Sequence, residues 1–80
     1  DHAQALPLAE RALAEYPQHP GNPYLLGLAI LSNAPERRTE GLRLIESTAR
    51  LEPRSDHVVE DLAIQIDARD LLAVEQSSAL

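Results

Sequence analysis

Histidine and carboxylate side chains are the groups of this chain that could bind a metal ion. The histidines His2, His19 and His57 are widely separated, and the nearest approach to a metal pair is His57 with Glu60 or Asp61, about one helical turn away. A zinc site needs three or four ligands at fixed geometry. One histidine beside two acids does not provide that set. We therefore expect no metal site and no cofactor, with His57 solvated or at a helix cap.

Paired carboxylates could also act as a general acid and base, and Glu60 with Asp67 or Asp70 is the candidate pair. Such a pair needs an apolar cleft that shifts one pKa, whereas a short helical chain offers an open surface. The sequence also lacks a G-x-S-x-G element, a phosphate-binding glycine loop and any cysteine. We therefore expect that the chain is not an enzyme.

Composition indicates one small all-α domain. The chain has 80 residues, which make a single domain (residues 1–80). Its core must be built from Leu, Ile, Val and Ala, because Phe, Trp, Met and Cys are absent and only Tyr16 and Tyr24 are aromatic. Ala, Leu, Arg and Glu are among the best helix formers. Because alanine lets facing helices approach closely, stacked helix pairs are favoured over a barrel or a sandwich.

The charge is acidic and unevenly distributed. The net charge is −6, and residues 56–80 carry six of the thirteen acidic residues against Arg69 alone. An acidic surface argues against a nucleic-acid partner, because phosphates require a basic footprint. No apolar run approaches the ~18 residues that span a bilayer. We expect a protein or peptide partner, with neither nucleic acid nor a membrane span.

Compartment and source are only weakly indicated. The lack of a visible signal peptide slightly favours the cytoplasm, and a periplasmic location fits if a leader was removed. All seven basic residues are arginine. Together with the alanine and proline usage, this favours a GC-rich bacterial source.

Proline residues divide the chain into four predicted helices. Pro7 requires the first helix to begin close before it, and Tyr16-Pro17 ends that helix, because the residue before a proline leaves the helical region. Pro53 closes the third helix in the same way. The predicted helices span residues 4–16, 23–33, 36–52 and 56–75, with a break near 68–70 left open.

The starts of two helices and the buried face of the last one can also be predicted. Asn22 followed by Pro23 predicts an N-cap and first-turn pair, and Ser55 or Asp56 can cap the last helix. Apolar residues at helical spacing predict the face that this last helix buries. They are Val58, Val59, Leu62, Ala63 and Ile66.

The chain resembles itself at an offset of 36 residues. Leu26 aligns with Leu62, Gly27 with Ala63, and Ile30 with Ile66. Self-similarity at a fixed period of this size predicts a repeat architecture. The other matching pairs are Ala5 and Gly41, Leu6 and Leu42, Leu8 and Leu44, Glu10 and Glu46, Ala12 and Thr48, and Pro17 and Pro53.

The repeated residues resemble the tetratricopeptide repeat family. Leu26-Gly27 and Leu62-Ala63, each followed by an isoleucine, resemble the first helix of such a repeat. The second-helix pattern, small–x3–apolar–x2–small–x4–proline, occurs as Ala5, Ala9, Ala12, Pro17 and as Gly41, Ile45, Thr48, Pro53. The resemblance is to a divergent member of about two repeats, with a period of 36 instead of about 34.

This resemblance implies antiparallel helix hairpins stacked as a short right-handed α-solenoid. Because the chain begins with a second helix, it also implies a fragment of a longer array, since about three repeats are normally needed for a continuous core. The function it implies is a protein–protein interaction scaffold that binds a peptide or protein along a concave groove. Leu26 and Leu62 are then expected in the core.

The groove residues implied by the resemblance lie on the first helices of the two repeats. An apolar stripe beside an acidic one suits an amphipathic or basic peptide. Carried over residue by residue, the partner-binding positions are Tyr24, Leu28, Leu31, His57, Glu60, Ile64 and Asp67.

Two other functions remain open at this point. The chain could be a regulatory or substrate-presenting segment of a larger bacterial enzyme, or of a secretion or polysaccharide-export protein. It could also be a homo-oligomerisation module, because no following repeat covers the helix predicted at 56–75, and exposed apolar stripes mark interaction sites. A homodimer through this C-terminal helix is the form that we expect in that case.

Overall fold

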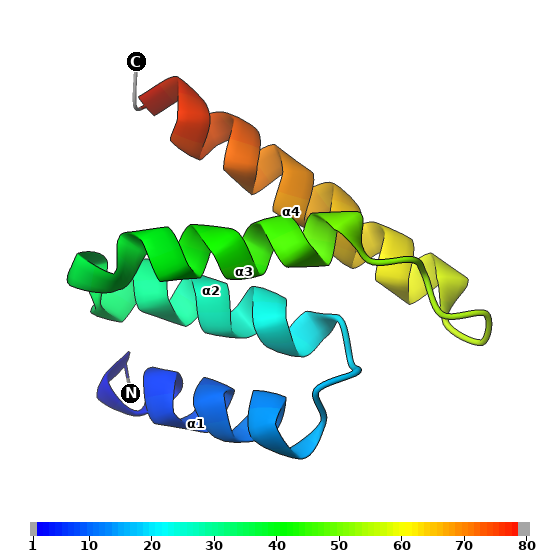
Figure 1. Cartoon of the computed structure of the whole chain (residues 1–80), viewed down its shortest axis with the longest axis horizontal. Coiled ribbons are helices and arrows are strands. Elements are labelled where there is room, and N and C mark those ends of the chain that lie inside the picture. Colours follow the sequence, from blue (N-terminus) through cyan, green and yellow to red (C-terminus); the bar gives the residue numbers. More distant parts are fainter. Residues whose placement is uncertain (1, 79–80) are drawn as a thin grey trace.

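The computed structural model describes residues 2–78, and within this range the chain forms helices and connecting loops only. The elements are α1 (His2–Glu15), α2 (Gly21–Asn33), the 3-10 helix η1 (Pro35–Arg37), α3 (Arg38–Arg50) and α4 (Val58–Ser78). Figure 1 shows each α-helix running roughly opposite to the one before it. The predicted all-α class is therefore confirmed. The side chain of His2, and residues Asp1, Ala79 and Leu80, lie outside the described part.

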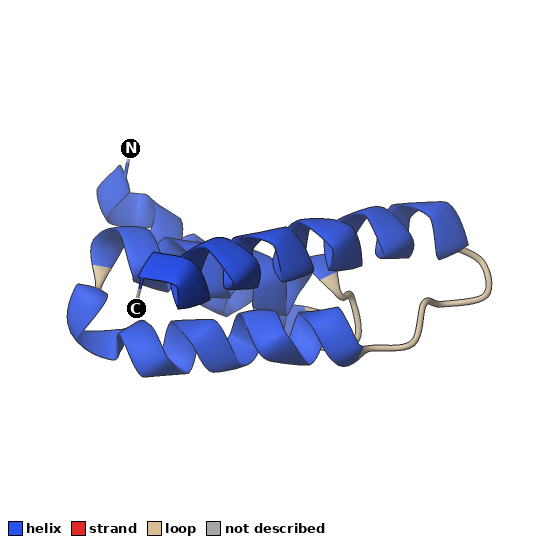
Figure 2. Cartoon of the chain, turned by 90° about the horizontal axis from the view of Figure 1, so that it is seen from above, coloured by secondary structure: helices blue, strands red, loops and turns tan. Residues whose placement is uncertain are grey.

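The helices pack in the order in which they occur along the chain. α1 packs on α2, α2 on α3, and α3 on α4, and a smaller contact joins α2 to α4. Within the described residues, α1 packs against neither α3 nor α4. Seen from above, this gives an elongated layered shape with the longest loop at one end (Figure 2). Consequently α2 is covered on two sides, while α1 and α4 each have a neighbour on one side.

The first helix begins earlier than the proline rule predicts. α1 starts at His2 and encloses Pro7. Pro7 cannot donate to the carbonyl four residues before it, but its ring is exposed. The proline therefore costs one backbone hydrogen bond without disturbing the packing on α2.

The first core cluster lies around α2 and consists of the buried residues Leu26, Ile30 and Ala34. Ile30 has no exposed surface, and Leu26 is only 6 % exposed. Apolar side chains from both neighbouring helices pack against this cluster, which explains why α2 is apolar on nearly all sides. They are Leu6, Ala9 and Leu13 from α1 and Leu44 from α3.

Two glycines set the close approach of α2 and α3. A Cβ atom at Gly27 would lie 2.6 Å from Cγ1 of Ile45 and 2.8 Å from the carbonyl oxygen of Gly41. A Cβ atom at Gly41 would lie 3.1 Å from the carbonyl oxygen of Gly27. The two backbones therefore meet with no room for a side chain at Gly27.

The second core cluster joins α3 to α4 and consists of Ile45, Ala49 and Ala68. The guanidinium of Arg69 donates to the carbonyl oxygen of Ala49 at 3.3 Å, which adds a polar link between the same helices. The partly buried side chains around the cluster come from α2 and α4. They are Tyr24, Leu28, Leu31, Leu71 and Leu72.

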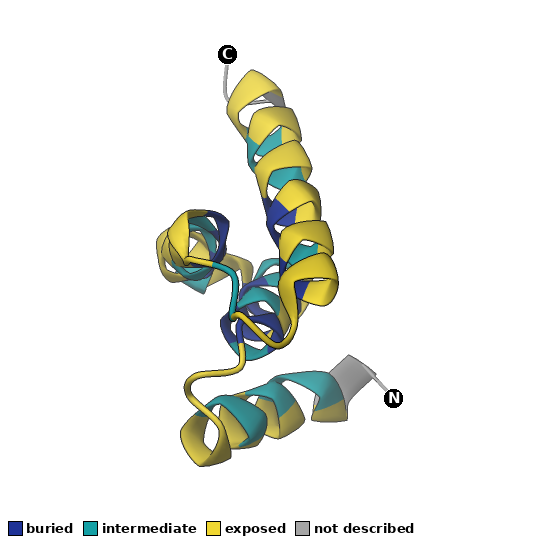
Figure 3. Cartoon of the chain, turned by 90° about the vertical axis from the view of Figure 1, so that its right-hand side faces the viewer, coloured by how far each residue is buried: buried dark blue, intermediate teal, exposed yellow. Residues whose placement is uncertain are grey.

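The buried face of α4 differs from the predicted one. Asp61, Gln65 and Ala68 are buried, whereas Leu62 is 44 % exposed and Ile66 55 % exposed. The prediction that Leu62 lies in the core is therefore wrong, because α3 covers only one side of α4. Figure 3 shows this helix as largely exposed with a narrow buried stripe. The rest of the predicted stripe, Val58, Val59 and Ala63, is exposed as well.

The connection before α2 uses a histidine where an asparagine cap was predicted. The helix starts at Gly21, whose N–H donates to Nδ1 of His19 at 3.0 Å. Asn22 lies inside the helix, and its amide donates to the carbonyl oxygens of Ala12 and Tyr16. Asn22 therefore ties α2 to the end of α1 instead of capping its own helix.

The start of α4 is held by an ion pair between the half-buried Arg54 and the buried Asp61. Arg54 donates to the carboxylate of Asp61 through its backbone N–H at 2.8 Å, its Nε at 2.9 Å and its Nη2 at 2.9 Å. Ser55 and Asp56, the predicted caps, lie in the turn before the helix, and the His57 carbonyl accepts the Asp61 N–H at 2.9 Å. The helix is continuous to Ser78, without a break near 68–70.

We expect this ion pair to make stability depend on pH in the acid range. The hydrogen bonds from Arg54 are the main reason that the pKa of Asp61 falls from 3.8 to about 2. Because the folded pKa is the lower one, the contribution to stability is complete above pH 3.8 and is lost as the pH falls toward 2. Melting curves of wild type and Asp61→Asn should differ at neutral pH and converge over that interval. Curves that stay parallel throughout would contradict the assignment.

Candidate functional site

The predicted partner-binding residues lie on α2 and on the first half of α4. Their exposure falls into two groups, which correspond to the apolar and the polar members of the set. Tyr24, Leu28, Leu31 and Ile64 are half-buried, whereas His57, Glu60 and Asp67 are exposed.

The structure brings the middle of this set together between α2 and α4. Burial raises the pKa of Tyr24, and the negative charge of Asp67 raises it further. One turn earlier, Cδ1 of Ile64 reaches to 3.6 Å from the Cβ position of Gly21, at the start of α2.

The two leucines of the set also contribute to packing. Leu28 and Leu31 lie against the second core cluster of Ile45, Ala49 and Ala68. Their remaining exposed surface is the part that a partner could contact. Substitutions at these two positions would therefore affect both the stability and the binding surface.

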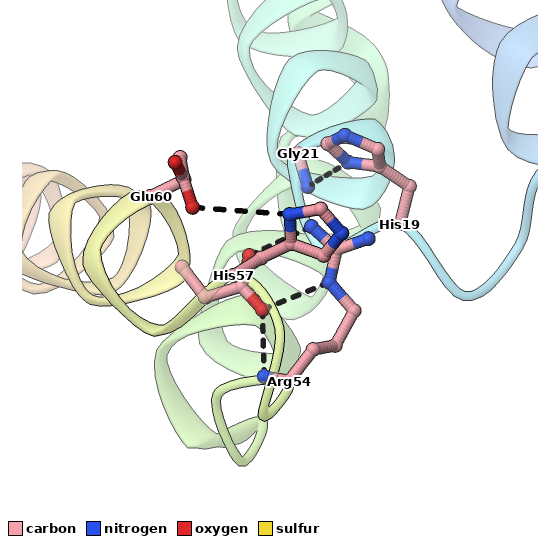
Figure 4. A network of polar contacts seen from close by, with 6 residues as sticks. His19, Gly21, Arg54, His57 and Glu60 are labelled. Atoms are coloured by element: carbon pink, nitrogen blue, oxygen red, sulfur yellow. Dashed lines mark hydrogen bonds and ion pairs between the residues drawn. The ribbon is translucent and has the colours of Figure 1, made fainter.

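Two of the polar members, His57 and Glu60, lie around the start of α4. Nδ1 of His57 and Oε2 of Glu60 are 3.9 Å apart, and both side chains are largely exposed. Figure 4 shows this pair near Arg54, with His19 from the loop before α2 and Gly21 at the start of α2 close by. The two loops lie side by side, because His19 and Arg54 line the same open hollow of about 450 Å³. Both side chains are therefore accessible at this end of the molecule.

An apolar hollow between α1 and α2 was not predicted from the sequence. It has a volume of about 420 Å³, and Leu8 and Leu25, both exposed, form part of it. Leu8 and Leu25 are apolar although they lie outside the faces that were predicted to be buried. This is the sequence signal that could have revealed the hollow. The other lining residues are Ala5, Ala9, Ala12, Leu28, Ala29, Ser32 and Asn33.

A third open hollow, over η1 and α3, is lined by charged side chains that include Arg37 and Glu40. Arg37 donates to the carboxylate of Glu40 at 2.8 Å and 2.9 Å, which lowers the pKa of Glu40. Arg37 also lies 4.0 Å from Glu10 of α1. The guanidinium of Arg37 is therefore already paired with the carboxylates of Glu40 and Glu10. Its charge is not free to bind a ligand in this hollow.

Among residues 2–78, neither a metal cluster nor a membrane-spanning helix is found. No three His, Asp or Glu side chains gather in a ligand-like group in the described part of the chain. None of the helices over residues 2–78 combines the length and the apolar character that crossing a bilayer requires. Comparison of the chain with protein-family models, with curated proteins and with solved structures finds no match in any of the three.

Proposed function

We propose that this chain is a protein-interaction scaffold, built as a short right-handed α-solenoid of tetratricopeptide-like repeats. The packing of each helix on its sequence neighbours supports this architecture, because each repeat of a solenoid contacts only the next. The close contact of Gly27 and Gly41 supports it too, since both fall on small-residue positions of the repeat pattern.

The binding surface of this scaffold is the face shared by α2 and α4. The observation that carries the proposal is the approach of Ile64 on α4 to Gly21 at the start of α2, and the negative charge of Asp67 on α4, which raises the pKa of Tyr24 on α2, agrees with it. Half-buried apolar groups there adjoin exposed carboxylates. This combination suits an amphipathic segment with basic side chains, docked along the groove.

A basic amphipathic peptide tests the proposal. We expect a peptide of leucines and lysines to bind in low salt and to bind more weakly as salt is added. The same peptide with glutamates in place of lysines should not bind. Binding of both peptides with equal affinity would contradict a role for the acidic side chains.

Neutralising the acidic residues of the groove should weaken binding of the leucine–lysine peptide. Glu60→Gln and Asp67→Asn should each reduce affinity by up to about fivefold, because an exposed ion pair contributes about 0.2–1 kcal/mol. Titration calorimetry of both variants provides the measurement. Glu36→Gln is the matched control, because Glu36 is an exposed glutamate on η1, away from this face. An equal loss in the control would show a general charge effect and contradict the site.

A further inference from the structure

The outer face of α4 is apolar and uncovered, although the equivalent face of α2 is buried. Leu26 and Ile30 on α2 are 6 % and 0 % exposed. Their counterparts 36 residues later, Leu62 and Ile66, are 44 % and 55 % exposed. The residue types of the two faces match, so the difference in burial must come from what covers them.

Both α1 and α3 cover this face of α2, and α3 is the one whose counterpart is missing on α4, because α3 packs on α4 as α1 packs on α2. Gly41 of α3 lies against Gly27, and Leu44 of α3 packs on the first core cluster, which contains Leu26 and Ile30. A helix that covered α4 in the same way would place a small residue near Ala63 and a leucine over Leu62 and Ile66.

The first helix of the chain has these residues at the corresponding positions. Ala5 corresponds to Gly41, and Leu8 corresponds to Leu44. Leu8 is 59 % exposed, and α1 does not pack against α4 of its own chain. The face of α1 that contains Ala5 and Leu8 is therefore available to another molecule. It corresponds to the face of α3 that packs on α2.

The turn that brings α3 onto α2 is not repeated after α4. α2 ends at Asn33 and is followed by Ala34 and Pro35. The residues 36 positions later, Asp70 and Leu71, lie inside the continuous helix α4. Within the described residues, α4 therefore has the face that a helix like α3 could cover. The turn that would connect α4 to such a helix does not occur at the equivalent position.

We propose that α1 of a second copy of this chain covers the outer face of α4, so that copies stack head to tail. Leu8 of the second copy lies over Leu62 and Ile66 of the first, and Ala5 lies against Ala63. The second copy continues the alternation of helices, because its α1 occupies the place that α3 occupies on α2. The contact is heterologous, so each copy keeps one free end and stacking can continue.

The residue sizes at this contact compensate for one another. On α2 and α3, Gly27 has no space for a Cβ atom because Ile45 occupies it. At the equivalent contact, Ala63 has a Cβ atom, but Ile45 is replaced by the smaller Ala9. In the proposed stack, Ala63 of α4 therefore faces Ala9 of the second copy. At the equivalent contact within one chain, Gly27 of α2 faces Ile45 of α3.

This proposal depends on the repeat correspondence and not on the peptide site proposed above. The groove residues of α4 are Glu60, Ile64 and Asp67, whereas the stacking face consists of Leu62, Ala63 and Ile66. The two residue sets do not overlap, so failure of one proposal leaves the other testable.

Sedimentation velocity over a wide range of protein concentrations tests the stacking. Wild type should sediment faster as its concentration rises. Leu8→Glu blocks the face on α1, and Ile66→Glu blocks the face on α4. Each variant alone should remain at the 8.8 kDa of a single chain. Both positions are exposed in the monomer, so melting curves should show that both variants stay folded.

Mixing the two variants gives the decisive result. The intact α1 of Ile66→Glu should bind the intact α4 of Leu8→Glu, which gives a complex of one copy of each that cannot grow further. Leu51→Glu is the matched control and should associate like wild type, because Leu51 is exposed outside both faces and its repeat counterpart, Glu15, is already a glutamate.

Three results would overturn the proposal. One is a wild type that stays monomeric at every concentration. Another is a mixture of the two variants that forms no complex. The third is a Leu8→Glu variant that associates like wild type while Ile66→Glu does not, since this would show pairing of two α4 faces instead of α4 with α1.

Discussion

Replacing Ile30 by alanine is expected to lower the free energy of unfolding by about 2–5 kcal/mol, whereas the same change at Ile66 should alter it by no more than about 0.5 kcal/mol. The two isoleucines are equivalent in the repeat, but Ile30 is 0 % exposed between its neighbours and Ile66 is 55 % exposed. Truncating Ile30 removes buried contacts and leaves a cavity, while truncating Ile66 removes surface that water already reaches.

Urea denaturation followed by circular dichroism provides the measurement. It should be done in dilute protein, because self-association through Ile66 would stabilise the folded wild type at high concentration. The substitution is the same at both positions and both lie within helices, so helix propensity cancels in the comparison. Equal losses at the two positions would show that the outer face of α4 is covered in the monomer, contrary to the structure.

The sequence was sufficient to predict the class of the fold and the approximate helix positions. Proline chemistry limits the helices locally: α1 ends at Glu15, just before Tyr16-Pro17, and α3 ends at Arg50, before Pro53. These signals act within a few residues of the chain, so they can be recognised without knowing the packing. The helix starts were less accurate, because the start of α2 depends on a hydrogen bond from Gly21 to His19.

The buried face of α4 could not be predicted by the same means. Periodicity shows which residues are apolar, but burial also requires a neighbouring helix to cover them. Leu62 and Ile66 repeat the apolar pattern of α2 without such a neighbour. The face that does pack contains Asp61, which a pattern of apolar residues cannot reveal because its burial depends on Arg54, seven residues earlier.

The arrangement of the candidate site residues depends on tertiary packing, which the sequence pattern does not show. The family resemblance predicted Tyr24 and Asp67 on one groove, and in the structure burial and then the charge of Asp67 raise the pKa of Tyr24. It also places Leu28 and Leu31 on the second core cluster, so these side chains act partly as core. Because that cluster combines residues of α3 and α4, its contact with α2 depends on tertiary packing and not on any local signal.

The close contact of α2 and α3 gives the second large effect. Replacing Gly27 by alanine is expected to lower the free energy of unfolding by about 1–3 kcal/mol, as overpacking of a core does. In an exposed helix interior the same change would raise stability by about 1 kcal/mol, so the sign of the effect is diagnostic. The new Cβ atom would lie 2.6 Å from Cγ1 of Ile45 and 2.8 Å from the carbonyl oxygen of Gly41. The two helices would have to separate.

A double-mutant cycle with Ile45→Ala identifies the cause of this loss. Truncating Ile45 removes the nearest atom, so Gly27→Ala should cost about 0.5–3 kcal/mol less in that background than in wild type. The double variant has the alanines that the repeat equivalents, Ala63 and Ala9, already have. Ala63→Gly is the control, and its cost should be limited to the roughly 1 kcal/mol of helix propensity. If Gly27→Ala cost the same in both backgrounds, or raised stability, the spacing of α2 and α3 would not be set by the contact between Gly27 and Ile45.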